Sequence, residues 1–167
     1  IANWSRDLGF AGLDLSFMGN WTAHSKFQAN QDDPTSINRD CVGFYSINCA
    51  SIQPEFSFTQ RTTLQIGSAD VSLRWRYIDG VEVEPSEASS FLEEFRTIPA
   101  EHYFDLTTRF NVEENFSFTV AAINLFDNEP KIVGSNIGST AYNSGNVYPS
   151  TYDALGRRFS VTGRITF

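Results

Sequence analysis

Apolar and polar residues alternate with a period of two along much of this chain, and that pattern restricts it to a β-rich fold. The alternation is clearest in the last segment, 157–167. Its apolar positions are Phe159, Val161, Gly163, Ile165 and Phe167. The residues between them, which include Arg158 and Arg164, fall on the other face. Successive side chains of a strand point to opposite sides, so this segment predicts a strand with one apolar and one polar face.

The same alternation recurs upstream. It predicts strands over 9–22, 54–66, 71–78, 102–112, 116–125 and 151–167, and the end of an earlier strand within 1–4. We therefore predict an all-β fold that contains six complete antiparallel strands and the end of a seventh.

The connections between these segments alternate between short and long. The long polar connections are 23–53, 79–101 and 126–150, and the tight turns are 5–9, 67–70 and 113–115. Antiparallel neighbours send successive connections to opposite ends of a sheet, so all long loops are expected at one end. Outer-membrane barrels of bacteria have short periplasmic turns and long extracellular loops. The pattern therefore predicts a transmembrane up-and-down β-barrel in the bacterial outer membrane.

The predicted polar faces carry arginines, namely Arg74, Arg76, Arg109, Arg158 and Arg164. Charged side chains are costly in a closed protein core and ordinary in a water-filled barrel lumen. The aromatics Trp21, Trp75, Tyr77 and Tyr103 lie near predicted strand ends, where membrane barrels have aromatic girdles. A soluble β-sandwich with its arginines on the solvated side is the alternative interpretation.

The composition of the chain excludes some classes of protein and of partner. The chain has 167 residues, a net charge of −8 and no run of 18 apolar residues. The negative charge argues against nucleic acid as a partner, and the lack of a long apolar run excludes a predicted transmembrane helix. Since the sequence begins IANWS, without an initiator Met, we expect it to be a piece of a longer protein.

Cys41 and Cys49 lie in a polar segment with no His nearby. A disulfide, half of a metal site and two free thiols are all compatible with this pattern, and we favour the disulfide. It would indicate an oxidising compartment. We predict neither a metal site nor a cofactor.

Three stretches of the sequence are distinctive, namely NLFDNEP at 124–130, HYFDLTTRF at 102–110 and VYPSTYDALGRRFSVTGRITF at 147–167. They resemble the C-terminal barrel strands of TonB-dependent receptors. LRWRYIDG at 73–80 and the Cys pair fit the same family, and the resemblance covers essentially the whole chain. The chain departs from many members at Lys131, which follows Pro130 where they have a second proline.

The resemblance implies a 22-stranded barrel around a plug domain, in a receptor that imports a surface-bound ligand with energy transmitted by TonB. The plug and the TonB contact would belong to a missing N-terminal region. The resemblance also implies that Phe167, as a C-terminal aromatic residue, is a signal for the outer-membrane assembly machinery. Lipid and lipopolysaccharide are further expected partners, and the expected ligand is a carbohydrate or another organic nutrient, with siderophore-bound iron as the alternative.

Ligand contacts are expected from aromatic residues in the long loops, because aromatic rings offer large contact areas at low entropic cost. The candidates are Phe44, Tyr45, Tyr142, Tyr148 and Tyr152. The alternative role for each of them is packing of one loop on another. The acidic segment 79–101 could bind cations or bridge to lipopolysaccharide, or it could be a solvated loop.

No enzymatic activity is expected. The sequence lacks a G-x-S-x-G elbow, and neither His24 nor His102 has partners at a catalytic spacing. A hydrolase embedded in a barrel is the enzymatic alternative. A passive porin or a structural outer-membrane barrel is the closest alternative to the transport receptor, followed by a soluble β-sandwich binding module.

Overall fold

The computed structural model describes residues 1–33, 35–36, 38–49, 52–134 and 146–166. Its main feature is a sheet of seven strands in which every neighbouring pair is antiparallel. In sheet order the strands are β1 (Ala2–Asp7), β2 (Gly12–Trp21), β6 (Phe56–Ile66), β7 (Ala69–Ile78), β10 (Glu101–Glu113), β11 (Phe116–Ile123) and β12 (Arg158–Ile165). The prediction of an all-β, antiparallel fold is confirmed. The sheet is open, with β1 and β12 at its edges.

Most predicted boundaries are shifted by one to three residues, and two differences change the course of the chain. The last strand was expected over 151–167, but β12 begins only at Arg158, because residues 151–157 turn back toward the sheet. The first turn was expected over 5–9, but β1 continues to Asp7 and the chain reverses at Leu8–Ala11, where the Leu8 N–H donates to the Ala11 carbonyl.

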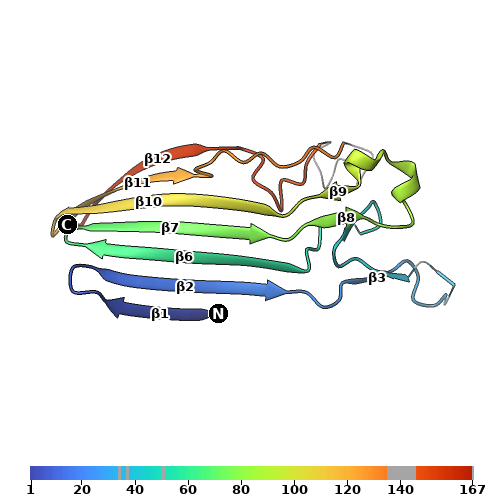
Figure 1. The fold of residues 1–167 in the computed structure, drawn as a ribbon, viewed down its shortest axis with the longest axis horizontal. Helices are drawn as coiled ribbons and strands as arrows, with labels where there is room; N and C mark the ends of the chain where they lie inside the picture. The colour runs from blue at the N-terminus through green and yellow to red at the C-terminus, as the bar shows by residue number, and fades with distance from the viewer. Residues whose placement is uncertain (34, 37, 50–51, 135–145, 167) are drawn as a thin grey trace.

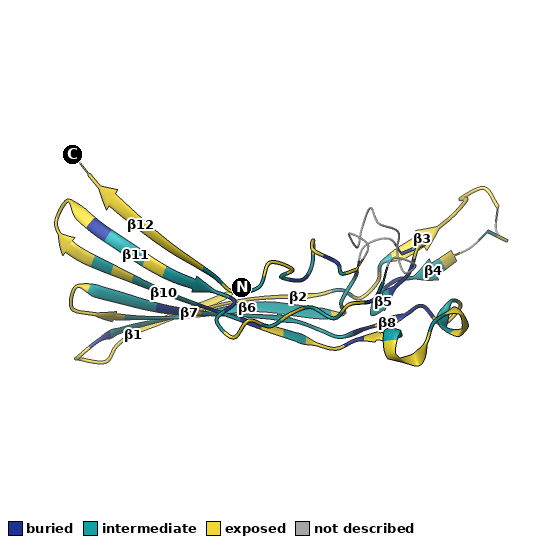
Figure 2. Cartoon of the chain, turned by 90° about the horizontal axis from the view of Figure 1, so that it is seen from above, coloured by how far each residue is buried: buried dark blue, intermediate teal, exposed yellow. Residues whose placement is uncertain are grey.

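The connections are sorted between the two ends of the sheet. Figure 1 shows the three long connections at one end, and the turns that join β1 to β2, β6 to β7 and β10 to β11 at the other. The sheet is also strongly twisted, and its strands fan apart toward the end with the short turns (Figure 2). No helix in the described part of the chain is long and apolar enough to cross a membrane.

The strand register places most of the large apolar side chains of the sheet on one face and most of its arginines on the other. Antiparallel cross-strand partners share a face, so the pairing of Leu13 with Leu64 and of Leu64 with Val71 extends one face over β2, β6 and β7. We call this the apolar face. It carries Leu13, Leu15, Phe17, Trp21, Phe56, Phe58, Leu64, Val71, Leu73, Trp75, Tyr77, Phe104, Leu106, Phe110, Phe118, Val120, Phe159 and Val161.

The opposite side, here called the polar face, carries the arginines that the alternation placed there. They are Arg61, Arg74, Arg76, Arg109, Arg158 and Arg164. Tyr103 also lies on this face, opposite Arg76, and is fully buried. It is therefore separated by the sheet from Trp75 and Tyr77, with which it was expected to form one girdle.

The long loops contain regular structure that their polar composition did not predict. Strands β3 (Lys26–Gln28) and β4 (Asn38–Asp40) form a hairpin, and β5 (Phe44–Tyr45), β8 (Val81–Val83) and β9 (Thr97–Ile98) form a three-stranded sheet. Two short 3-10 helices, η1 (Ala88–Ser90) and η2 (Glu93–Phe95), lie between β8 and β9. Because β5 comes from the first long loop and β8 from the second, backbone pairing ties these two loops together.

The buried hydrophobic cluster lies at this loop end and not beneath the middle of the sheet. Its members are Tyr45, Ile52, Val81, Val83, Ile98, Tyr103, Val133, Tyr148 and Tyr152. All three long loops contribute, and Tyr103 joins the cluster from the start of β10. We call this the loop core. Burial of large side chains stabilises it, so the loops form a packed head on the sheet.

Polar contacts also connect the first two loops. Arg39 forms an ion pair with Glu84, and both side chains are largely buried. The Asn48 amide donates to Glu87 at 2.8 Å. Two acidic residues of segment 79–101 thus hold the loops together instead of lying in a wholly solvated segment. The predicted disulfide between Cys41 and Cys49 is confirmed, and it closes the part of the first loop that contains Phe44 and Tyr45.

We predict that replacing both cysteines by alanine will loosen the loop core without disturbing the main sheet. Losing a cross-link across a loop of this length should cost about 2–3 kcal/mol in the chain-entropy account. Hydrogen exchange at the Gly43 and Phe44 amides, which donate to Gln53 and Cys41, should therefore become faster. Amides in the centres of β6 and β7 serve as the internal control. Unchanged protection at Gly43 and Phe44 would contradict the stabilising role of the disulfide.

Candidate functional site at the loop end of the polar face

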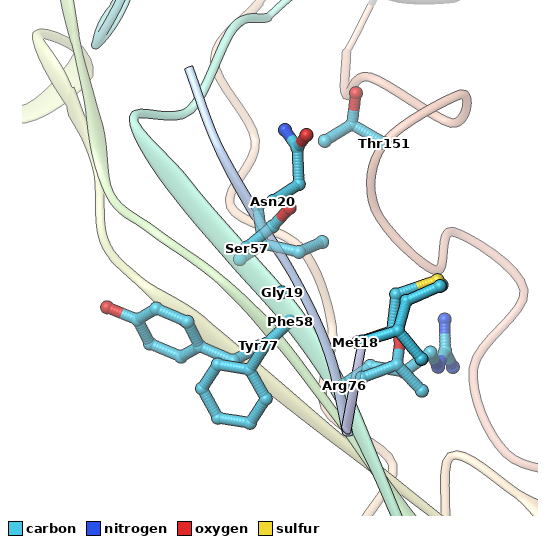
Figure 3. Close-up of a pocket in the computed structure, with 11 residues that line it drawn as sticks. Met18, Gly19, Asn20, Ser57, Phe58, Arg76, Tyr77 and Thr151 are labelled. Carbon is cyan, nitrogen blue, oxygen red and sulfur yellow. The ribbon is translucent and has the colours of Figure 1, made fainter. Parts of the chain in front are cut away.

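A pocket of about 490 Å³ opens on the polar face where β2, β6 and β7 meet the third long loop. Side chains that line it include Met18, Asn20, Ser57, Thr59, Arg76 and Thr151. In Figure 3 the rings of Phe58 and Tyr77 point away from Thr151, whereas Met18 and Arg76 extend on the side of the third loop. This arrangement follows from the register, which places Phe58 and Tyr77 on the apolar face.

Arg76 connects the pocket to a network of ion pairs. Asp105 receives Arg74 Nε on its Oδ2 at 2.6 Å, and Arg76 Nε lies 3.3 Å from the same oxygen. Asp153 receives Arg158 Nη1 at 2.7 Å and Nη2 at 3.0 Å, while Arg76 Nη2 lies 3.4 Å from its Oδ2. Both carboxylate side chains are only 5% exposed. The network thus joins β7, β10 and β12 to the third loop through charge-assisted hydrogen bonds.

Arg76 also contacts an aromatic ring. Its guanidinium carbon lies 5.0 Å from the centroid of the buried Tyr103 ring, within the range of a cation–π interaction. Arg76 therefore has the ring on one side and two carboxylates near its nitrogens, and it still lines the pocket.

Burial raises the pKa of Asp153, but hydrogen bonds from the Arg158 guanidinium and the Leu155 N–H lower it, and the net result lies below the usual aspartate value. Asp153 therefore stays ionised at neutral pH. A carboxyl whose pKa is lowered by folding stabilises the folded form above its ordinary pKa, and this contribution is lost as the pH falls through the folded pKa.

The segment NLFDNEP forms a tight, hydrogen-bonded turn immediately after β11. Asn124 is fully buried and left-handed, with φ of 53°, and its N–H donates to Asp105 Oδ1 at 2.8 Å. Its side-chain amide donates to the Asn128 carbonyl, and its Oδ1 accepts the Asn128 N–H. Asn suits this position because it tolerates the left-handed conformation and supplies both hydrogen-bonding groups.

Asp127 joins this turn to the segment that precedes β12. Its φ is 59°, and its Oδ1 accepts the Arg157 N–H at 2.7 Å. A Cβ atom at Gly156 would lie 2.9 Å from the same oxygen, and Gly156 has a φ of 68°, so a glycine is required there on both counts. The two stretches on which the family resemblance chiefly rests, 124–130 and 147–167, therefore contact each other. We call this contact the third-loop latch.

The aromatic ligand candidates that fall within the described residues do not line the pocket. Tyr45, Tyr148 and Tyr152 are buried in the loop core, and the Tyr45 and Tyr148 rings meet edge to face. Burial, with a smaller contribution from Glu87, raises the pKa of Tyr148 to about 12. The ligand-contact role of these tyrosines stays a prediction, and their burial favours loop packing. Phe44 is half-buried in β5, whereas Tyr142 lies outside the described residues, as does the predicted assembly signal Phe167.

Both histidines have local partners. His24 Nδ1 lies 2.6 Å from Asp40 Oδ2 in the exposed hairpin region. His102 accepts the Trp75 indole N–H at 3.1 Å on the apolar face. Within the described ranges, no group of three or more His, Cys, Asp or Glu side chains could hold a metal ion.

Sequence reasoning missed most of this site. The alternation correctly placed Asn20, Ser57 and Arg76 on polar faces, but it gave no reason to connect them with one another. Thr151 and Asp153 were assigned to a strand, although they lie in the part of the third loop that folds back over the sheet. The one available signal was the cluster of charged residues around 153–158, close to a predicted arginine-rich face.

No family model, curated protein or solved structure matches this chain. The likeness to TonB-dependent receptors therefore rests on the motifs in the sequence.

We predict that Asp153→Asn will weaken the attachment of the third loop. Hydrogen bonds to charged groups contribute about 1.5–3 kcal/mol each, so amide exchange at Tyr152 should accelerate measurably at pH 7. The difference between the wild type and the variant should shrink as the pH falls below 3.8 and disappear below the lowered pKa of folded Asp153, where the wild-type carboxyl is protonated. The matched control is Asp33→Asn, because Asp33 is an exposed aspartate whose carboxylate contacts only Thr35 among the hydrogen bonds of the described residues. A difference that persists unchanged at pH 2 would contradict the electrostatic role of Asp153.

A pair of substitutions at Asn124 should separate its backbone and side-chain roles. Asn124→Gly keeps the left-handed conformation and loses the side-chain hydrogen bonds, whereas Asn124→Ala also strains the backbone by about 1–2 kcal/mol. Alanine should therefore destabilise the third-loop latch more than glycine, as measured by limited proteolysis after Arg157. Equal cleavage rates for the two variants would contradict the conformational part of the argument.

Proposed function

We propose that this chain forms part of a transmembrane β-barrel that acts as an active-transport receptor in the outer membrane of a bacterium. The observation that carries the proposal is the register of the main sheet. It gathers most of the large apolar side chains of the seven strands on one face and places arginines on the other face of β6, β7, β10 and β12, whereas Arg6 of β1, which pairs with Leu13, lies on the apolar face. Alternation of lipid-facing and lumen-facing residues is the property that defines a membrane barrel strand.

The exposure of the apolar face supports a lipid environment. In the described part of the chain, large side chains on this face remain open, among them Val161 at 75%, Phe159 at 73% and Trp21 at 66%. Large exposed apolar side chains that gather on one face mark a contact with another protein or a membrane. A β-sandwich would need a second layer over this face, and no described element packs there.

An aromatic band at the loop end of the apolar face supports the same conclusion. Phe58 lies 4.8 Å from Trp75 and 5.1 Å from Tyr77, measured between ring centroids. The polar tips have partners, since the Tyr77 hydroxyl lies 2.9 Å from Asp79 and the Trp21 indole donates to Glu55. Rings with an apolar body and a polar tip suit the boundary between hydrocarbon and headgroups.

The packed loops beside the pocket support a role as a receptor and not as a passive pore. Loops that are packed, disulfide-linked and latched to the sheet form a preorganised head beside a pocket, which suits ligand capture better than passive diffusion. The 22-strand closure, the plug, the TonB contact and the assembly role of Phe167 follow from the family resemblance. Lipid and lipopolysaccharide would surround the barrel, and the ligand would be an organic nutrient.

Cell fractionation and uptake assays test this proposal and separate it from its alternatives. The native protein should be found in the outer membrane, and uptake of its ligand should stop when a protonophore removes the energy supplied through the inner membrane. A passive porin would continue to admit small solutes under the same treatment. A protein recovered only from a soluble fraction would contradict the membrane proposal altogether.

Neighbouring residues of β12 provide a matched test of which face meets lipid. Val161 lies on the apolar face and Ser160 on the polar face. Lysine at a lipid-facing position near the middle of the membrane costs about 2–4 kcal/mol, whereas a lumen-facing lysine remains in water. Val161→Lys should therefore reduce the amount of heat-modifiable, assembled barrel, and Ser160→Lys should not. Equal assembly of the two variants would contradict the assignment of the faces.

A further inference from the structure

We propose that the pocket on the polar face binds a small polyhydroxylated molecule with a single negative charge, such as a sugar acid. This inference names a ligand class for the receptor proposed above and rests on that proposed function.

The first argument is the charge of the surroundings. Three guanidinium groups, those of Arg74, Arg76 and Arg158, share the two carboxylates of Asp105 and Asp153. The network therefore has one surplus positive charge. One bound monoanion would neutralise the site, although the chain as a whole has a charge of −8.

The second argument identifies the guanidinium that meets the ligand. Arg74 and Arg158 approach their carboxylates to 2.6 Å and 2.7 Å, whereas the contacts of Arg76 are 3.3 Å and 3.4 Å long. Asp105 also accepts the Asn124 N–H, and Asp153 accepts the Leu155 N–H. Both carboxylates thus keep close partners if Arg76 turns toward a ligand. Arg76 is the charged side chain that lines the pocket, and its planar fork can bind a carboxylate through two hydrogen bonds.

The third argument concerns the remaining lining. Ser57, Thr59 and Thr151 present hydroxyl groups to the pocket, and among the described residues these side chains have no hydrogen-bond partner. Asn20 adds an amide whose nitrogen donates to Thr22. Ile1, Met18 and Ile78 line the same pocket, so the lining suits a ligand that has an apolar ring face as well as hydroxyl groups and one carboxylate. A purely apolar ligand would leave the polar groups of the pocket unpaired, at an energetic cost.

A matched pair of probes tests the inference on the native outer-membrane protein purified in detergent. Sodium D-glucuronate and D-glucose differ at one carbon, which is a carboxylate in the first and a hydroxymethyl group in the second. Isothermal titration calorimetry should show glucuronate binding at least about tenfold more tightly, as one charge-assisted contact predicts. Arg76→Gln should remove this preference. Arg109 of β10 lies on the polar face outside this pocket, so Arg109→Gln should preserve the preference for glucuronate.

Equal affinity for the two probes, no binding of either, or an equal loss in the Arg109 variant would overturn the inference. If Arg76→Gln does not assemble, Ser57→Ala with Thr151→Val tests the pocket outside the ion network, and it should weaken glucuronate binding several-fold. Unchanged binding in that variant would also overturn the inference. If only the ligand inference is wrong, the protein is still found in the outer membrane and uptake still depends on energy. If the proposed function is wrong, neither result is obtained.

Discussion

Backbone pairing across the seven-stranded sheet determines which side every strand residue occupies. A shift of one residue in any pair would move that strand's apolar side chains to the arginine-bearing side. The two-residue connection at Gly67–Ser68 helps to fix the register of β6 against β7, and the Arg74–Asp105 ion pair crosses from β7 to β10. The apolar face, the polar face and the pocket are all consequences of this register.

The loops are the second structural unit, and their stability has a different origin. The hydrophobic cluster lies in the loops, where Tyr45, Tyr148 and Tyr152 pack together, and the middle of the sheet lacks a described second layer. Buried contacts, a disulfide and the Arg39–Glu84 ion pair make this head rigid. Arg76 lies at the boundary of the two units, because it stacks on Tyr103 and contacts Asp153 of the third loop. A movement of Arg76 in the pocket would therefore change its contact with Asp153 of the third loop.

Much of the sheet could be predicted from the sequence, because alternation reports directly on which face each residue occupies. The strands of the main sheet, the sorting of loops and turns, and the Cys41–Cys49 pair were predicted, whereas the short strands within the long loops were not. The late start of β12 was not predicted, because tertiary contacts of Asp127 and Asp153 overcome a local pattern that fits a strand. The pocket was not predicted either, since its members come from three strands and a loop, and no local period relates Thr151 to the strands.

The central claim is that the apolar face meets lipid while the polar face meets water. Site-directed spin labelling along β10, one position at a time over 106–109, tests it most directly in native outer membranes. Labels at positions 106 and 108 should collide mainly with oxygen dissolved in the bilayer, and labels at 107 and 109 with a water-soluble nickel complex. A period of two in this accessibility is the predicted result. Uniform accessibility to the nickel complex at all four positions would contradict the account.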